Sequence, residues 1–264
     1  MTIKLVATDM DATFLDDSKH FDSKRFDKIY QYMTEHNIYF VSASGNQYYQ
    51  LKNFFKDYPK TLFVAENGAL VGDHDEIFQT WHFSSTVFHK ILSVLENTDH
   101  IQYIACGRKS AYILKSATAE FYKISKFYFP RLTQVDSLED VDDEILKFSV
   151  NCPLDETEAY MEHLANNIGK DVSVVSSGHG DIDIIQSDAN KATGLEYLSK
   201  KLNIKPEEMC AFGDGGNDLE MLRYVGHGVA MENASPIVLE TAPYQTTNNN
   251  DQGVLEHLES LFEV

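Results

Sequence analysis

The sequence predicts an α/β protein in which a parallel sheet carries helices on both faces and an α+β segment interrupts the chain. Short apolar runs alternate with apolar residues at helical spacing in residues 1–82, and the same alternation returns from residue 188 onward. Between these two parts, apolar runs come in adjacent pairs, which is typical of antiparallel hairpins. A β-α-β-α order favours a parallel sheet because each crossover brings the chain back to the same edge.

Residues 1–82 are expected to form the first part of the core. Apolar residues at helical spacing, from Phe26 to Met33, predict a helix that Asp22 can cap. A second helix is expected at 47–55, where the periodicity is less regular. Buried strands are predicted at 3–8, 38–42 and 62–65, and the last of them is stopped by Asn67 and Gly68.

Residues 188–264 are expected to complete the same core, and residues 83–187 to form a separate insert. The core part should contain strands at 209–212 and 228–231 and helices at 191–202, 219–224, 235–241 and 253–262. Pro236 suits the first turn of the third of these helices. The insert should contain hairpins 101–105 with 111–114 and 172–175 with 182–185, and helices at 86–95, 118–127 and 156–168.

The composition is that of a globular protein and excludes two classes of partner. Apolar residues make up 43% of the 264 residues, which is enough for a sizeable core. The net charge of −19 repels phosphate backbones and anionic lipids, so nucleic-acid and membrane-surface binding are not expected. The three cysteines form no Cys-x-x-Cys pair, which predicts reduced, partly buried thiols. No signal-peptide or membrane-helix pattern is found, so we expect a cytoplasmic protein.

Chemically reactive residue types follow several of the predicted strands. Asp9 and Asp11 come directly after the first strand, Ser44 follows the second, and Asp214 follows the strand at 209–212. Lys191 opens the helix that returns from the insert. Each of these motifs alone has an ordinary structural explanation, namely an Asx turn, a Ser-Gly turn, a helix N-cap or an exposed lysine.

The shared placement of these residues favours a functional explanation. Ligands bind beyond the carboxyl ends of the strands in an open parallel sheet, and all four strand-end residues fall there. Clustered carboxylates repel one another unless a cation neutralises them, and hard carboxylate oxygens suit Mg²⁺. A divalent ion beside a hydroxyl and an ammonium group makes a pocket for a phosphoryl group. The sequence therefore predicts a magnesium cofactor and a small phosphorylated metabolite as the partner.

Four segments resemble the four motifs of the haloacid-dehalogenase-like phosphatases: Asp9-x-Asp11-x-Thr13, Ser44, Lys191 and Gly213-Asp214-x-x-Asn217-Asp218. The resemblance spans essentially the whole chain. Residues 65–70 and the position of the insert are similar to the Cof-type branch, and residues 42–49 resemble its bacterial sugar phosphatases. The resemblance implies a Rossmann-like core with a mixed α/β cap inserted after the third strand, here at about residues 83–187.

The resemblance also implies a role for each motif residue. Asp9 would attack phosphorus, and Asp11 would protonate the leaving group and later activate water. Mg²⁺ would be held by Asp9, the backbone carbonyl of Asp11, and Asp214. The phosphate oxygens would be held by Lys191, the side chains of Ser44 and Asn217, and the backbone amides of Met10 and Gly45.

Four further residues are candidates for supporting roles. Asp218 is expected to support the site from behind the metal ligands, although an ordinary first-turn acid is an equal alternative. Asn67 is expected to shape the floor of the pocket. The hairpin tip of the insert could reach the substrate through His179 or Asp181, for each of which a plain surface turn is the competing explanation.

Two departures from the family pattern concern residues beside the motifs. Ala12 stands where the family usually has glycine, and the difference matters only if the backbone there needs a positive φ. Ser44 and Asn46 replace the more frequent threonine and arginine, which removes one potential contact to phosphate or sugar.

The function that this sequence favours is Mg²⁺-dependent hydrolysis of sugar phosphates and related small metabolites through an aspartyl-phosphate. A phosphomutase of the same superfamily is one alternative. A signalling domain that accepts phosphate on aspartate is another, although such domains are about half this length and lack a cap. The protein is expected to be a monomer or a weak homodimer.

Overall fold

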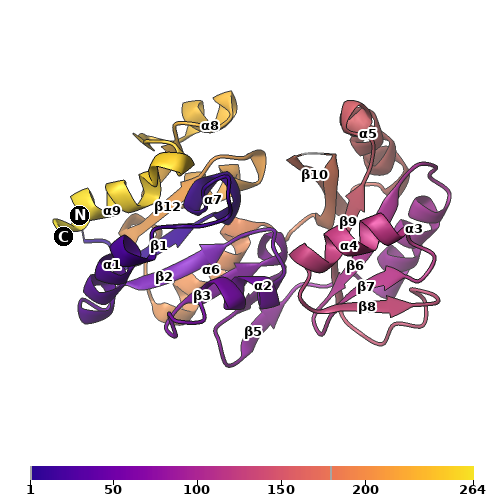
Figure 1. Cartoon of the computed structure of the whole chain (residues 1–264), viewed down its shortest axis with the longest axis horizontal. Coiled ribbons are helices and arrows are strands. Elements are labelled where there is room, and N and C mark those ends of the chain that lie inside the picture. The colour runs from indigo at the N-terminus through magenta and orange to yellow at the C-terminus, as the bar shows by residue number, and fades with distance from the viewer. Residues whose placement is uncertain (1, 179) are drawn as a thin grey trace.

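The structure is a computed structural model that describes residues 2–178 and 180–264, and its strands gather in two sheets (Figure 1). The larger sheet has six parallel strands followed by two antiparallel ones at one edge. In spatial order its strands are β14 (Tyr244–Thr246), β13 (His227–Met231), β12 (Met209–Gly213), β1 (Leu5–Thr8), β2 (Tyr39–Ala43), β3 (Leu62–Ala65), β4 (Leu70–Gly72) and β5 (Ile77–Thr80).

The helices of the core begin and end close to where the sequence predicts. Asp22 caps the first helix through its side chain, which accepts hydrogen bonds from the backbone amides of Lys24 and Arg25. Three of the core helices have the predicted bounds to the residue. The core helices are α1 (Ser23–Glu35), α2 (Tyr48–Phe54), α6 (Lys191–Leu202), α7 (Leu219–Tyr224), α8 (Pro236–Thr241) and α9 (Gly253–Phe262).

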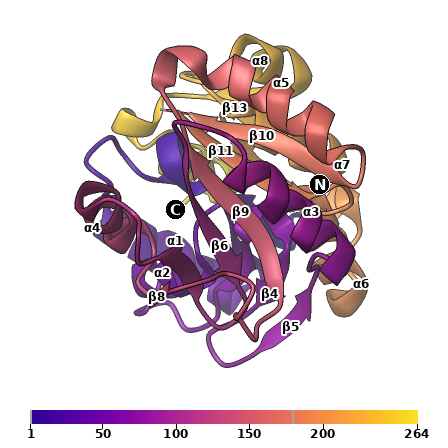
Figure 2. The same ribbon diagram turned by 90° about the vertical axis from the view of Figure 1, so that its right-hand side faces the viewer.

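The smaller sheet is built entirely from residues between 102 and 186. Its strands are, in spatial order, β10 (Val172–Gly178), β11 (Asp181–Gln186), β9 (Ile145–Asn151), β6 (Gln102–Gly107), β7 (Ala111–Leu114) and β8 (Leu132–Val135). Both predicted hairpins are present as antiparallel pairs. One face of the sheet looks toward the core, and the other is covered by α3 (Ser85–Glu96) and α5 (Thr157–Ile168), while α4 (Ala119–Tyr128) lies at the side (Figure 2).

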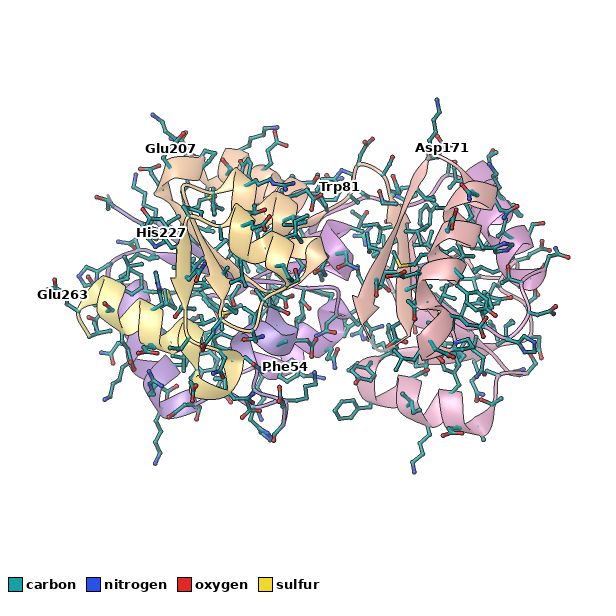
Figure 3. All side chains as sticks on the ribbon, turned by 90° about the horizontal axis from the view of Figure 1, so that it is seen from above. Phe54, Trp81, Asp171, Glu207, His227 and Glu263 are labelled. Carbon is teal, nitrogen blue, oxygen red and sulfur yellow. The ribbon has the colours of Figure 1, made fainter. Side chains whose placement is uncertain are left out.

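The predicted fold class, a Rossmann-like core with an inserted α+β domain, is confirmed. Each sheet has its own cluster of buried apolar side chains. We propose 83–187 as the bounds of the cap, because both chain crossings lie next to these positions. At the first crossing, Trp81 lies between the two parts and packs edge-on against Tyr197 of α6 (Figure 3).

Five strands were not predicted, and two of them make the core sheet mixed rather than fully parallel. Asn67 and Gly68 do not simply stop β3 but reverse the chain into β4, so that β4 and then β5 pair antiparallel. The backbone of Gly68 has a φ of 96°, and a Cβ there would lie 2.0 Å from the carbonyl oxygen of Asn190. Only glycine fits this turn without displacing the start of α6. The other unpredicted strands are β8, β9 and β14.

The three cysteines are free and buried, as the sequence predicts: Cys106, Cys152 and Cys210. Among the described residues, no helix combines the length and the apolar character that crossing a bilayer requires.

Two histidines at the edge of the core sheet predict a loss of stability in acid. The Nε2 atoms of His227 and His257 lie 3.0 Å apart, and the ring of His227 stacks on Tyr244. Burial lowers the pKa of His227, and burial together with the neighbouring His227 lowers the pKa of His257 to about 4. An unfolded histidine has a pKa near 6.5, so the unfolded state binds more protons between these values. The stabilisation is therefore complete above about pH 6.5 and is lost as the pH falls toward 4.

We expect the free energy of unfolding to fall by roughly 2 kcal/mol from this pair between pH 7 and pH 4. The measurement is urea denaturation of the wild type and of His257→Gln, which stays neutral throughout. The acid loss in the wild type should exceed that in the variant. Parallel pH profiles would mean that the pair does not resist protonation.

Candidate active site

The ends of three neighbouring strands bring the predicted site residues to one edge of the core sheet. Thr8 of β1 is in register with Ser42 of β2 and with Phe212 of β12, so the residues that follow these strands converge. The backbone amide of Asp9 continues this pairing by donating to the carbonyl of Phe212 at 3.0 Å. This is the carboxyl edge of the parallel strands, where the sequence predicts the site.

Lys191 joins two of the predicted acidic residues in a buried ion cluster. Its Nζ atom donates to Oδ1 of Asp9 at 2.5 Å and to Oδ1 of Asp218 at 2.6 Å. Lys191 and Asp218 are fully buried. The second oxygen of Asp218 accepts from the backbone amides of Asp214 and Gly215, each at 3.0 Å. Asp218 thus fixes both the lysine and the loop that carries Asp214.

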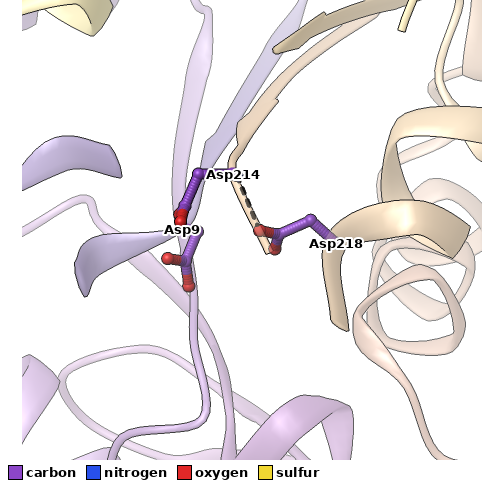
Figure 4. A group of neighbouring side chains, drawn as sticks. All are labelled: Asp9, Asp214 and Asp218. Atoms are coloured by element: carbon purple, nitrogen blue, oxygen red, sulfur yellow. Dashed lines mark hydrogen bonds between the residues drawn. The ribbon is translucent and has the colours of Figure 1, made fainter. Parts of the chain in front are cut away.

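Asp9, Asp214 and Asp218 each place a carboxylate oxygen within 4.8 Å of the others (Figure 4). Thr13 holds one oxygen of Asp214 through a 2.6 Å hydrogen bond. Burial raises the pKa of Asp9 well above its usual value, although Lys191 opposes the shift. Burial and the charge of Asp218 raise the pKa of Asp214 to about 6.

The charges of this cluster fit a bound divalent cation. Three carboxylates face a single ammonium group, so two negative charges lack compensation, and their repulsion adds to the burial that raises the pKa values of Asp9 and Asp214. Only oxygen atoms are offered by the acidic group, and such donors suit hard cations such as Mg²⁺. The residues present therefore fit the metal that the sequence predicts.

The residues predicted to bind phosphate lie on the loops around this cluster. Ser44 is buried, and its hydroxyl oxygen accepts from the backbone amide of Asn46 at 3.1 Å. Gly45 packs so closely on Asn67 that a Cβ atom would lie 3.0 Å from the amide oxygen of that side chain. The same oxygen of Asn67 accepts a 3.1 Å hydrogen bond from Asn217. Asn67 therefore lies between the loop of Gly45 and the loop of Asn217. Its place on the floor of a substrate pocket stays a prediction.

The Asp11 side chain lies apart from the three-carboxylate group. Its two oxygens accept from Lys19 at 2.6 Å and from Asn46 at 2.9 Å, and the side chain is 40% exposed. Asn46, which stands where the branch more often has arginine, thus holds Asp11. This contact was not predicted, nor was the one from Lys19. A lysine eight residues after the aspartate gives no sequence signal, because a loop joins them.

The residues on either side of Asp11 in the chain are Met10 and Ala12. Ala12 has a φ of 57°, which is the left-handed conformation that glycine adopts without strain. The replacement of the family's usual glycine by alanine therefore matters at this position. An alanine adopts this conformation at a cost of roughly 1–2 kcal/mol. Met10 is buried, and its side chain belongs to the core cluster.

The cap contains two of the predicted site residues, Asp181 and His179. Asp181 lies on β11 and accepts a 2.9 Å hydrogen bond from Asn151 on the neighbouring β9, so this contact is within the cap sheet. His179 lies outside the described residues.

Three buried charged residues at the boundary between core and cap were not predicted: Glu66, Lys147 and Asp183. A lysine in the apolar segment 145–150 was the signal that could have revealed them, because a buried lysine needs acidic partners. The segment was not recognised as a strand, and the partners are distant in sequence.

A family model described as haloacid dehalogenase-like hydrolase matches residues 6–258. The chain belongs to this family. Among curated proteins, this haloacid dehalogenase-like hydrolase is 39% identical to the 5-amino-6-(5-phospho-D-ribitylamino)uracil phosphatase YbjI of Escherichia coli, over 99% of this chain and 97% of that protein. It is 28% identical to a phosphatase of the same description, YcsE, from Bacillus subtilis, over 96% of this chain and 93% of that protein.

Solved structures share the fold of this chain. The crystal structure of SMU.1108c from Streptococcus mutans superimposes with a TM-score of 0.92 and 31% identity, and the match covers 100% of both chains. A haloacid dehalogenase-like hydrolase from Bacillus subtilis has the same fold, with a TM-score of 0.86 at 22% identity. The family and its named relatives together identify the chain as a phosphatase of the haloacid dehalogenase-like type.

Proposed function

We propose that this phosphatase is Mg²⁺-dependent and hydrolyses phosphorylated sugars, sugar alcohols and related small metabolites through an aspartyl-phosphate on Asp9. The observation that carries the proposal is the group formed at the carboxyl edge of the sheet by Asp214 and the buried residues Asp9, Asp218 and Lys191. Three carboxylates and one ammonium group around a single point provide a nucleophile, a cation site and a phosphate contact together.

In this proposal Asp9 attacks phosphorus with the carboxylate oxygen that does not accept the hydrogen bond from Lys191. The ammonium group of Lys191 holds the other oxygen and so fixes the direction of attack. In the proposal Lys191 also contacts the phosphate, together with Ser44, Asn217 and the amides of Met10 and Gly45. These groups would stabilise the negative charge of the equatorial oxygens, where charge is concentrated in the transition state.

Asp11 is the proposed general acid and base. Its carboxyl has Lys19 and Asn46 as partners and lies outside the group of Asp9, Asp214 and Asp218. A group placed there can reach the leaving oxygen of a substrate that enters from the cap side. It would donate a proton to the sugar alkoxide, which is a poor leaving group, and then take a proton from the attacking water.

Asp9, Asp214 and the backbone carbonyl of Asp11 are the proposed metal ligands, and Asp218 supports them by holding Lys191 and the backbone around Asp214. When bound, Mg²⁺ reduces the repulsion between the carboxylate nucleophile and the anionic phosphate and orients the phosphoryl group for in-line attack.

The substrate class rests on resemblance and on the relatives. Residues 42–49 resemble bacterial sugar phosphatases, and the Escherichia coli relative is named for a phosphate carried on a ribityl chain attached to a uracil ring. Both leaving groups are polyhydroxylated alcohols. We therefore propose 5-amino-6-(5-phospho-D-ribitylamino)uracil as a candidate substrate beside pentose and hexose phosphates.

The test is a phosphate-release screen over phosphorylated sugars, sugar alcohols, nucleotides and cofactors, with Mg²⁺ and with EDTA. We expect pentose, hexose or ribityl phosphates among the better substrates, and a loss of turnover of about 10²-fold or more when the metal is removed. Restoring Mg²⁺ to the same sample should restore turnover and controls for damage by the chelator. Reaction of nucleotides or pyridoxal phosphate alone would overturn the sugar assignment, and full turnover in EDTA would overturn the metal assignment.

The same samples test the remaining alternatives. A phosphomutase would convert a sugar monophosphate into its isomer and would depend on a bisphosphate activator, whereas a phosphatase releases free phosphate. A signalling acceptor would accumulate phosphoprotein without turnover. The match to a family of hydrolases over residues 6–258 favours release of phosphate.

A further inference from the structure

A cluster of buried polar groups joins the cap to the core beside the proposed active site. Lys147 of β9 places its Nζ atom 2.6 Å from the carbonyl oxygen of Gly45, 3.2 Å from Oδ2 of Asp183 and 3.5 Å from Oε2 of Glu66. Gly45 and Glu66 belong to the core, whereas Lys147 and Asp183 lie on adjacent strands of the cap sheet. The three charged side chains are each at most 4% exposed.

The charges of this cluster are poorly explained by stability alone. Replacing a buried ion pair with apolar groups of the same shape often leaves stability unchanged or higher. Here two carboxylates share one ammonium group, and burial raises the pKa of Glu66 to about 7 against the attraction of Lys147. Oε2 of Glu66 lacks a hydrogen-bond partner among the described residues. Such a polar cluster has an energetic cost, which favours a role in setting the position of the cap over a role in stability alone.

The cluster contacts both loops that carry proposed phosphate-binding groups. On one side, Lys147 holds the carbonyl of Gly45, whose neighbour is Ser44. On the other side, Asp183 accepts a 2.6 Å hydrogen bond from Asn67, and the amide oxygen of Asn67 accepts from Asn217. The loop of Gly45 is therefore linked to the cap by one hydrogen bond, and the loop of Asn217 is linked to it by two successive hydrogen bonds through Asn67.

The backbone between these contacts would not hold its shape alone. Glu66 and Asn67 both have positive φ values, 52° and 56°. Consecutive residues in the left-handed region persist only where surrounding contacts hold them. The side chains of both residues are bound from the cap side, Glu66 facing Lys147 and Asn67 donating to Asp183.

We propose that Lys147 is a positioning residue for the phosphatase reaction. Its ammonium group holds the Gly45 loop directly and, by pairing with Asp183, supports the Asn67 side chain that orients Asn217. The phosphate-binding groups thus reach their working positions when the cap sheet is docked on the core. This inference rests on the proposed function, because it assigns Gly45 and Asn217 to phosphate binding.

The experiment compares Lys147→Met with the wild type on two substrates, acetyl phosphate and ribose 5-phosphate, and measures inhibition by inorganic phosphate. Acetyl phosphate offers almost no leaving group for a cap residue to contact. We expect kcat to fall about 10²-fold for both substrates, because a displacement of about 1 Å in positioning groups has an effect of this size. The inhibition constant of inorganic phosphate should rise. Lys170→Met, an exposed cap lysine, is the matched control and should behave as the wild type.

Each remaining outcome has a defined meaning. A loss confined to ribose 5-phosphate would show that Lys147 contacts the sugar and would overturn the positioning role. Unchanged kcat on both substrates would also overturn it. A wild type that turns over neither substrate would contradict the proposed function. The role of Lys147 would then still be tested by comparing the binding of inorganic phosphate to the wild type and to Lys147→Met.

A second variant separates positioning from folding, because Lys147→Met leaves buried carboxylates without a cation. The triple variant Lys147→Met, Glu66→Gln and Asp183→Asn removes all three charges at nearly constant volume. We expect it to melt close to the wild-type temperature while kcat stays reduced, since the contact to the Gly45 carbonyl is still missing. Recovery of wild-type kcat in this variant would show that the lysine serves only to neutralise charge.

Discussion

Asp9→Asn is expected to reduce phosphate release at least about 10³-fold while the protein keeps its fold. A carboxamide is uncharged and does not attack phosphorus. The substitution is nearly isosteric, and Lys191 keeps Asp218 as an ionic partner. It also removes one of three mutually repelling carboxylates, so the free energy of unfolding should be unchanged or higher by up to about 1 kcal/mol. Phosphate release and thermal melting of the same preparation check both expectations.

The matched control is Asp142→Asn, which removes one carboxylate from a fully exposed position of the cap. This variant should retain wild-type turnover and melting temperature. If Asp9→Asn kept more than a few per cent of wild-type turnover, Asp9 would not be the attacking group. If Asp9→Asn failed to fold, the prediction that stability survives the removal of one carboxylate charge from the cluster would be wrong.

Lys191→Met is expected to lower both stability and phosphate release, because the lysine pairs with buried carboxylates and takes part in the proposed reaction. Burial acts to lower the pKa of Lys191, but the charges of Asp218 and Asp9 raise it overall, so the group is a buried cation. Removing one partner of a buried pair costs about 3–5 kcal/mol of stability. Phosphate release should fall about 10³-fold, since the nucleophile loses its orienting contact and the phosphate loses a cation.

Urea denaturation with and without Mg²⁺ measures the loss of stability in Lys191→Met and tests whether a divalent cation offsets it. A divalent cation near the three carboxylates should recover part of the lost stability in Lys191→Met. The double variant Lys191→Met with Asp218→Asn removes one charge of each sign and should melt closer to the wild type without regaining activity. Wild-type melting of the single variant would contradict the burial of an ion pair at this position.

The parts of the fold that the sequence predicts well are those with strong local signals. The bounds of α6 follow from Asn190, whose side chain caps the helix by accepting from Thr193, and from Asn203 in a left-handed conformation at its end. The strand-end acids were found for a different reason. Parallel strands of known direction place their carboxyl ends together, so Asp9 and Asp214 meet although the chain separates them widely.

The parts that were missed depend on contacts between distant segments. The strand β9 contains Lys147 in an apolar run, and its place in the cap sheet becomes visible only once Asp183 and Glu66 are beside it. Similarly, Asn67 and Gly68 look like the end of a strand, while their actual role as a reversal into β4 depends on packing against the start of α6. Local pattern does not encode such contacts, because their energy comes from groups elsewhere in the chain.

The order of strands in the larger sheet has a consequence for how the protein is made. β1 lies at the middle of that sheet and pairs on one side with β2 and on the other with β12, near the opposite end of the chain. During synthesis the ribosome delivers the whole insert before β12 emerges, so the nascent first strands wait with an unpaired apolar edge. Completing the sheet then requires closure of a long loop, which slows folding. A pause or a truncation before residue 209 would leave this edge open to aggregation or to a chaperone.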